Sequence, residues 1–143
     1  MELFVVINEQ GPHWDPAKPM QEQAGWPEHA AFMNALVDDR TVVLGGPLRR
    51  GSKHRAMLIL RAADEVALRA RLADDPWMRS GVLRLGEMLP WELLLGELPS
   101  PGAPAGTLTQ TLRKRPRRSS RSVRSRGVRA PRVPIERSWS TAE

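Results

Sequence analysis

The chain has 143 residues, of which 41% are hydrophobic, so it has room for one ordinary domain with an apolar core. Its net charge of +6 is uneven: residues 1–96 carry 11 Lys and Arg against 13 Asp and Glu, and residues 97–143 carry 11 against 3. This distribution excludes a basic nucleic-acid-binding surface as the main feature of the first segment. The absence of cysteine excludes disulfides, thiolate nucleophiles and cysteine-based zinc sites.

The first third of the chain predicts a strand, a long loop and a helix. Residues 3–7 are β-formers and predict the strand. Glycine and proline recur through residues 8–25 and predict a loop, whose length is more typical of a functional segment than of an idle one. A helix over residues 27–38 follows, since Pro27 suits a first helical position. The apolar residues at helical spacing are Phe32, Met33, Leu36 and Val37.

Three further strands are predicted. Residues 41–44 form the second strand, which is followed by a Gly-Gly-Pro sequence. A bulge or a tight exit there is expected to place Gly46 and Pro47 beside a substrate. Residues 55–61 form the third strand, and the leucines within residues 83–95 indicate the fourth.

A second helix is predicted between the third and fourth strands. Asp64 and Glu65 suit its first turn, where negative charge is favoured. It should end near Asp74, because Asp75 precedes Pro76 and is pushed toward extended geometry. Its inward stripe is predicted to consist of small apolar residues, namely Val66, Ala67, Ala70 and Ala73.

The predicted element order is β-α-β-β-α-β, which is typical of a ferredoxin-like α+β fold with a four-stranded antiparallel sheet and two helices on one face. The first and third strands are apolar on both faces, although two helices can cover only one. A second copy of the chain is therefore expected to cover the other face, in a dimeric α/β-barrel-like homodimer. The alternative is coverage by the long loop or by the C-terminal segment.

The composition changes abruptly at residue 97, so we predict a folded domain over residues 1–96 and a disordered basic tail over residues 97–143. An Arg- and Ser-rich tail can bind nucleic acid through phosphates without sequence preference. The alternative is a solvated extension without a partner. The N-terminus has no basic start, and no apolar stretch approaches the roughly 20 residues that span a bilayer, so the sequence predicts a cytoplasmic protein without membrane association.

His29 is the candidate for chemistry, because its spacing from Met33 and Leu36 places it on the helix face turned toward the sheet. A lone histidine on such a face is usually packed in the core. A functional role needs a partner that orients the imidazole, and Asp75 is the candidate, with a turn residue as the alternative. The three histidines have no metal-ligand spacing, so no metal or other cofactor is predicted.

Four segments in register resemble the YciI-like (YCII-related) family over residues 1–96. They are Trp26-Pro27-Glu28-His29, Val42-Val43-Leu44-Gly45-Gly46-Pro47, Asp74-Asp75-Pro76-Trp77 and Leu89-Pro90-Trp91. The resemblance implies a ferredoxin-like fold, usually dimeric, with a His–Asp pair in a cleft, which here would be His29 and Asp75. Relatives include a dehydrochlorinase of a chlorinated hydroxyhydroquinone. Many members carry an arginine where this chain has Trp26, which argues against an anionic substrate.

A histidine held by a carboxylate can remove a proton from carbon or from a phenol and return it elsewhere. The sequence therefore favours a cofactor-independent lyase or isomerase that acts on a small, aromatic substrate. Trp14, Trp26 and Trp77 flank the motifs and are expected to line its pocket, with ordinary packing as the alternative for each. The other candidate functions are a non-catalytic module that binds a small molecule in the same cleft, and a nucleic-acid tether in the tail.

Overall fold

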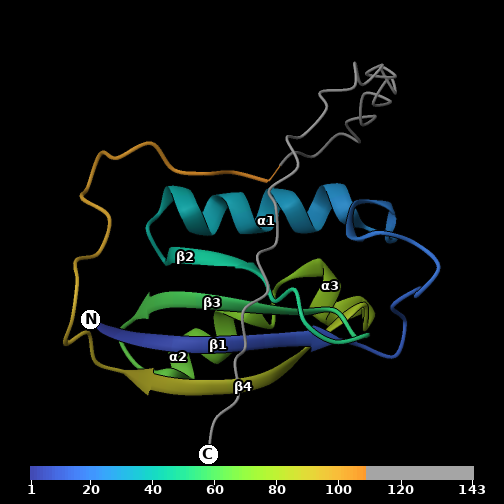
Figure 1. The fold of residues 1–143 in the computed structure, drawn as a ribbon, viewed down its shortest axis with the longest axis horizontal. Helices are drawn as coiled ribbons and strands as arrows, with labels where there is room; N and C mark the ends of the chain where they lie inside the picture. The colour runs from blue at the N-terminus through green and yellow to red at the C-terminus, as the bar shows by residue number, and fades with distance from the viewer. Residues whose placement is uncertain (109–143) are drawn as a thin grey trace, which may run out of the picture.

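The computed structural model describes residues 1–108 as one sheet flanked by helices (Figure 1). The antiparallel sheet has four strands in the order β2-β3-β1-β4, which are β1 (Glu2–Gln10), β2 (Val42–Pro47), β3 (Arg55–Ala62) and β4 (Leu83–Trp91). The helical elements are η1 (Met20–Glu22), α1 (Trp26–Asp38), α2 (Glu65–Leu72) and α3 (Pro76–Ser80). The predicted ferredoxin-like α+β fold is confirmed, with η1 and α3 as additions to it.

Most of the predicted basic tail, residues 109–143, lies outside the described residues. Its described part, residues 97–108, contains no helix or strand. Figure 1 shows the chain leaving the end of β4, passing the strand ends near the N-terminus and turning back along α1. This segment therefore returns to the fold, close to the helix that carries His29.

Two strands are longer than predicted, because backbone pairing extends into segments rich in turn-forming residues. β1 continues through Asn8 and Gln10, which pair with Ala56 of β3 and Leu83 of β4. β2 includes the Gly-Gly-Pro sequence, and its glycine at position 45 leaves space that the side chain of Leu58 fills. The predicted loop thus begins only after residue 10, and the expected exit of the second strand is part of the strand.

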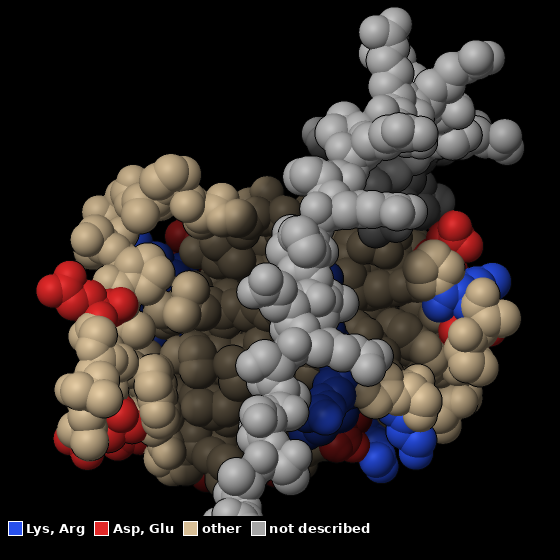
Figure 2. Space-filling model, in the orientation of Figure 1, with Lys and Arg blue, Asp and Glu red and all other residues tan. Residues whose placement is uncertain are grey.

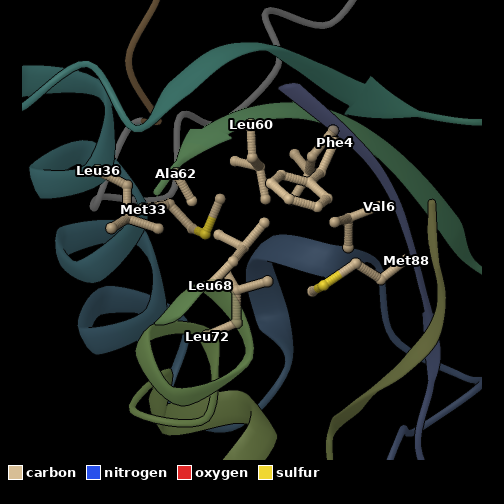
Figure 3. Packing of buried hydrophobic residues seen from close by; sticks show 10 residues of the cluster. Phe4, Val6, Met33, Leu36, Leu60, Ala62, Leu68, Leu72 and Met88 are labelled. Carbon is tan, nitrogen blue, oxygen red and sulfur yellow. The ribbon is translucent and has the colours of Figure 1, made fainter. Parts of the chain in front are cut away.

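The core lies between the sheet and the helices α1 and α2. The cross-strand pairs of β1 and β3 on this face are Phe4 with Leu60 and Val6 with Leu58. Figure 3 shows apolar side chains from α1 and α2 meeting the phenyl ring of Phe4 and its neighbours on the sheet. This packing fixes α1 against the sheet, and with it the position of His29.

The predicted inward stripe of α2 is wrong. Leu68 and Leu72 face the core, at 1% and 3% exposure, whereas Val66 is 77% exposed. The alanines at positions 67, 70 and 73 are also exposed. A leucine removes more apolar area from water than an alanine, so the two leucines, four residues apart, set the rotation of the helix.

The second face of the sheet is apolar, as its alternating residues predict. Val5 pairs on this face with Ile59 of β3 and Leu89 of β4. Several large apolar side chains here stay exposed, by 52% for Leu89 and 41% for Met57. In Figure 2 the charged groups lie mostly toward the rim of the face in view, and much of the rest is uncharged. An apolar face of this kind is suited to contact with another protein surface.

Candidate active site

His29 and Asp75 are in direct contact at the start of two helices. His29 lies in the first turn of α1, and Asp75 is the N-cap of α3, where its Oδ1 accepts a hydrogen bond from the backbone N–H of Trp77 at 2.9 Å. Nδ1 of His29 lies 2.8 Å from Oδ1 and 2.9 Å from Oδ2 of Asp75. His29 is 6% exposed and Asp75 is 1% exposed. The predicted contact between the two side chains is confirmed.

This contact decides which imidazole nitrogen is free. A carboxylate only accepts hydrogen bonds, so the proton of a neutral His29 belongs on Nδ1, and Nε2 keeps its lone pair. Asp75 is held in turn by its capping bond to Trp77. The arrangement produces an oriented imidazole that can take a proton at Nε2.

Aromatic rings fix the plane of the imidazole. The rings of His29 and Trp77 are stacked, with centroids 4.0 Å apart and an interplanar angle of 6°. Trp26 tilts against both, with its ring centroid 5.9 Å from that of His29 and 5.6 Å from that of Trp77. The indole N–H of Trp77 donates to the carbonyl of Ala24 at 2.7 Å. His29 is therefore held both by a hydrogen bond and by packing.

A cleft of about 820 Å³, here called the α1 cleft, has His29 in its wall. α1 and β2 form its two long sides, and β3 contributes Ala56 and Leu58. Of the residues predicted to contact a substrate, Gly46, Pro47 and Trp77 line this cleft. The volume suits a small organic molecule.

The other two predicted pocket residues, Trp14 and Trp26, are not among the lining residues of the α1 cleft. Trp26 is 3% exposed and belongs to an apolar cluster with Trp77. Trp14 packs against the same cluster and stacks on the ring of His54, with centroids 4.4 Å apart. Both tryptophans thus pack against residues that line the cleft and help to position them.

Asn8 is a cleft residue that the sequence interpretation missed, because residue 8 was assigned to the loop. It is 3% exposed and lines the α1 cleft. Among the described residues, its Oδ1 is the buried side-chain oxygen or nitrogen that has no hydrogen-bond partner. The alternation Phe4, Val6, Asn8 along one strand was the available signal, since it places the amide on the inward face.

His54, which directly precedes β3, also lines the α1 cleft. Its ring is half-buried against Trp14. Its backbone N–H donates to Oε1 of Gln10 at 3.1 Å, which ties the start of β3 to the end of β1. Burial lowers the pKa of His54 below the usual value of 6.5, and the positive charge of a protonated His29 lowers this pKa further. The neutral form of His54 is therefore favoured.

The α1 cleft has a neutral end and a charged end. His29, Asn8, His54 and Trp77 lie at the first, whereas the charged lining residues are Asp38, Arg40 and Arg61. Asp38 lies nine positions after His29 on α1, which corresponds to about 13 Å along the axis. Within residues 1–108, no group of three or more histidine or acidic side chains is placed to hold a metal ion.

Residues 98–108, here called the C-terminal wall, form one side of the α1 cleft. Their attachment point is Asn34 of α1, whose Nδ2 donates to the carbonyl of Leu108 at 2.9 Å. The Oδ1 of Asn34 accepts from the backbone N–H of Leu108 at 2.7 Å. The predicted domain boundary at residue 96 would therefore separate the cleft from one of its own walls.

No protein-family profile and no curated protein matches the chain. A solved structure with a similar fold is the 5-chloro-2-hydroxyhydroquinone dehydrochlorinase TftG from Burkholderia phenoliruptrix AC1100, in complex with 2,5-dihydroxybenzoquinone. The match has a TM-score of 0.40 and 18% sequence identity, and covers 66% of this chain and 95% of that chain. No helix in the described part of the chain has the length and apolarity to cross a membrane.

Proposed function

We propose that the chain is a YciI-like protein whose α1 cleft catalyses cofactor-independent proton transfer, as a lyase or isomerase acting on a small, uncharged molecule. The observation that carries the proposal is the contact of His29 Nδ1 with both oxygens of the buried Asp75, at 2.8 and 2.9 Å, in the wall of a cleft. The four sequence segments that resemble the family support the same assignment.

The proposed reaction begins with removal of a proton from a C–H or a phenolic O–H of the substrate by Nε2 of His29. Asp75 stabilises the imidazolium that forms and keeps its ring in place. The imidazolium then returns the proton to another atom of the substrate, which gives an isomerase. Alternatively, the electron pair left behind expels a leaving group as an anion, which gives a lyase of the dehydrochlorinase kind.

The uncharged substrate is supported by two features of the site. Trp26 occupies the position at which many family members carry an arginine, and its ring packs on His29 and Trp77. The lining residues with a full charge lie at the other end of α1. An anionic group beside His29 would therefore lose its hydration without gaining a cationic partner.

Solvent exchange tests the proposal without knowledge of the product. The full-length protein would be incubated in D₂O with a panel of small phenols, enols and halogenated hydroxy-aromatic compounds. Mass spectrometry would then follow deuterium incorporation at carbon and loss of halide. We expect exchange or elimination with at least one compound, above the rate without protein. An absence of both across the panel would contradict the enzyme proposal and favour a non-catalytic binding module.

A binding or regulatory module is the second candidate, and the C-terminal wall favours it. A ligand in the α1 cleft contacts residues 98–108, so occupancy can be transmitted to the chain that follows Leu108. The proposed nucleic-acid tether rests on 11 Lys and Arg within residues 109–143, which lie outside the described residues.

We expect the protein to be a homodimer joined through the second face of the sheet. Met57→Lys introduces a charge among Val5, Ile59 and Leu89 and should weaken the dimer at least tenfold, because the charge must be desolvated in the interface. Val66→Lys is the matched control, since Val66 is 77% exposed on α2, away from that face. Sedimentation of the full-length proteins measures both effects. A monomeric wild-type protein at micromolar concentration would disprove this association.

A further inference from the structure

Asn8 is an amide in a position that packing alone would fill with an apolar residue. It follows Phe4 and Val6 on the inward face of β1, and its cross-strand neighbours are Ala56 and Leu85. A buried amide among apolar neighbours destabilises the fold unless its hydrogen bonds are made. Its Oδ1 has no partner among the described residues. Stability therefore does not explain this residue.

Two other amides among residues 1–108, one buried and one half-buried, have both of their side-chain groups paired. Gln23, which is 4% exposed, accepts from the backbone N–H of Asp15 at 2.8 Å and donates to the carbonyls of Asp15 and Lys18. Asn34, which lines the same cleft as Asn8, uses both of its side-chain groups on Leu108. Asn8 differs from these two because its side chain lines the cleft while its oxygen has no hydrogen-bond partner among the described residues.

The neighbours of Asn8 in the cleft define what can bind its oxygen. Ala56 pairs with Asn8 and is two residues from His54, and His54 lines the same cleft as His29. The end of the cleft near Asn8 thus holds two imidazoles and an indole, with no lysine, arginine or unpaired carboxylate among its lining residues. Such an environment disfavours a charged ligand group and accepts a neutral one.

We infer that Asn8 determines specificity, because its Oδ1 accepts a hydrogen bond from an uncharged donor, a hydroxyl or N–H group, on the molecule bound beside His29. A ligand with a donor would satisfy Oδ1, whereas a ligand without one would leave it unpaired. Discrimination of this kind against a missing donor is stronger than discrimination by size. The inference rests on the proposed function, since it names the class of molecule that the same cleft takes.

Phenol, anisole and benzoate are suitable probes, because they share a ring and differ in the group that would meet Asn8. Anisole keeps the oxygen but lacks the donor, and benzoate adds a negative charge. NMR titration of the full-length protein, with the side-chain amide of Asn8 and the indole N–H of Trp77 as reporters, gives the dissociation constants. We expect phenol to bind about three- to tenfold more tightly than anisole, and benzoate to bind more weakly than phenol.

Asn8→Leu should reduce the preference for phenol over anisole to nearly none, while the melting temperature stays equal or rises. Gln23→Leu is the matched control: it removes a buried amide that does not line the cleft, so it should keep the preference and lower the melting temperature. Asn8→Asp keeps a hydrogen-bond acceptor at this position. Under conditions in which this variant is folded, it should retain the preference for phenol over anisole.

Any of four results would overturn the inference. They are equal affinity of the wild-type protein for phenol and anisole, no shift of the cleft reporters with millimolar phenol, an unchanged preference in Asn8→Leu, and a large stability loss in that variant. A donor preference that depends on Asn8, in a protein that shows no solvent exchange, would keep this inference and remove the enzyme. Turnover without a donor preference would keep the enzyme proposal and remove the inference about Asn8.

Discussion

Replacing His29 with glutamine is expected to lower the rate of solvent exchange by about 10²- to 10⁴-fold, the usual contribution of a positioned general base. Glutamine can still donate to Asp75, so the buried carboxylate keeps a hydrogen bond. The change therefore removes the basic Nε2 lone pair while it preserves most of the packing. Exchange rates at saturating ligand, together with the melting temperature, separate the two effects.

His13→Gln is the control for this variant. His13 is exposed, and its Nδ1 contacts the carbonyl of Ser80 away from the α1 cleft, so its replacement should leave the exchange rate unchanged. A His29→Gln protein that exchanges at the wild-type rate would remove His29 from the mechanism. If exchange and stability fell together in proportion, His29 would be a packed core histidine, the alternative that its helix face suggests.

Replacing Asp75 with alanine is expected to destabilise the protein by about 2–4 kcal/mol, the sum of one lost helix cap and one buried donor left unpaired. The side chain of Asp75 caps α3 and also accepts from Nδ1 of His29. His29 and Asp75 are both buried, so water does not replace the carboxylate as a hydrogen-bond acceptor. Urea unfolding of the full-length protein, analysed by linear extrapolation, gives the difference in the free energy of unfolding.

Asp64→Ala is the matched control for Asp75→Ala. Asp64 is likewise an N-cap, and its Oδ1 accepts from the backbone N–H of Ala67 at 2.7 Å at an exposed site. Loss of an exposed cap should cost about 1 kcal/mol. Equal losses in the two variants would mean that the contact with His29 adds nothing to stability, and that Asp75 acts as a turn and cap residue alone.

The sequence predicted the element order because strand and helix periodicities are local. The predicted stripe of α2 failed because the helix could rotate toward either its alanines or its leucines, and the larger area buried by Leu68 and Leu72 decided. Asn8 was missed because residues that favour turns followed it closely, although pairing on both sides of β1 carries the strand to Gln10.

The contact between His29 and Asp75 could be suspected from family resemblance but not from spacing, since the two residues are 46 positions apart. What brings them together is α3, a helix of five residues that was not predicted. The Asp-Pro sequence at its start was interpreted as the end of α2. The same sequence is also a favourable helix start, with aspartate as the cap and Pro76 in the first turn. Both interpretations hold in the structure, since α2 ends at Leu72 and α3 begins at Pro76.

The size of the molecule that the α1 cleft can hold depends on the C-terminal wall, which lies outside the sheet. Residues 98–108 come after the last strand, yet they line the same cleft as β2. A protein shortened to residue 96 would keep all four strands and both groups of the His29–Asp75 pair. It would nevertheless admit molecules of a different size, because the cleft would have a wider opening. The side-chain amide of Asn34 would also lose both of its hydrogen-bond partners.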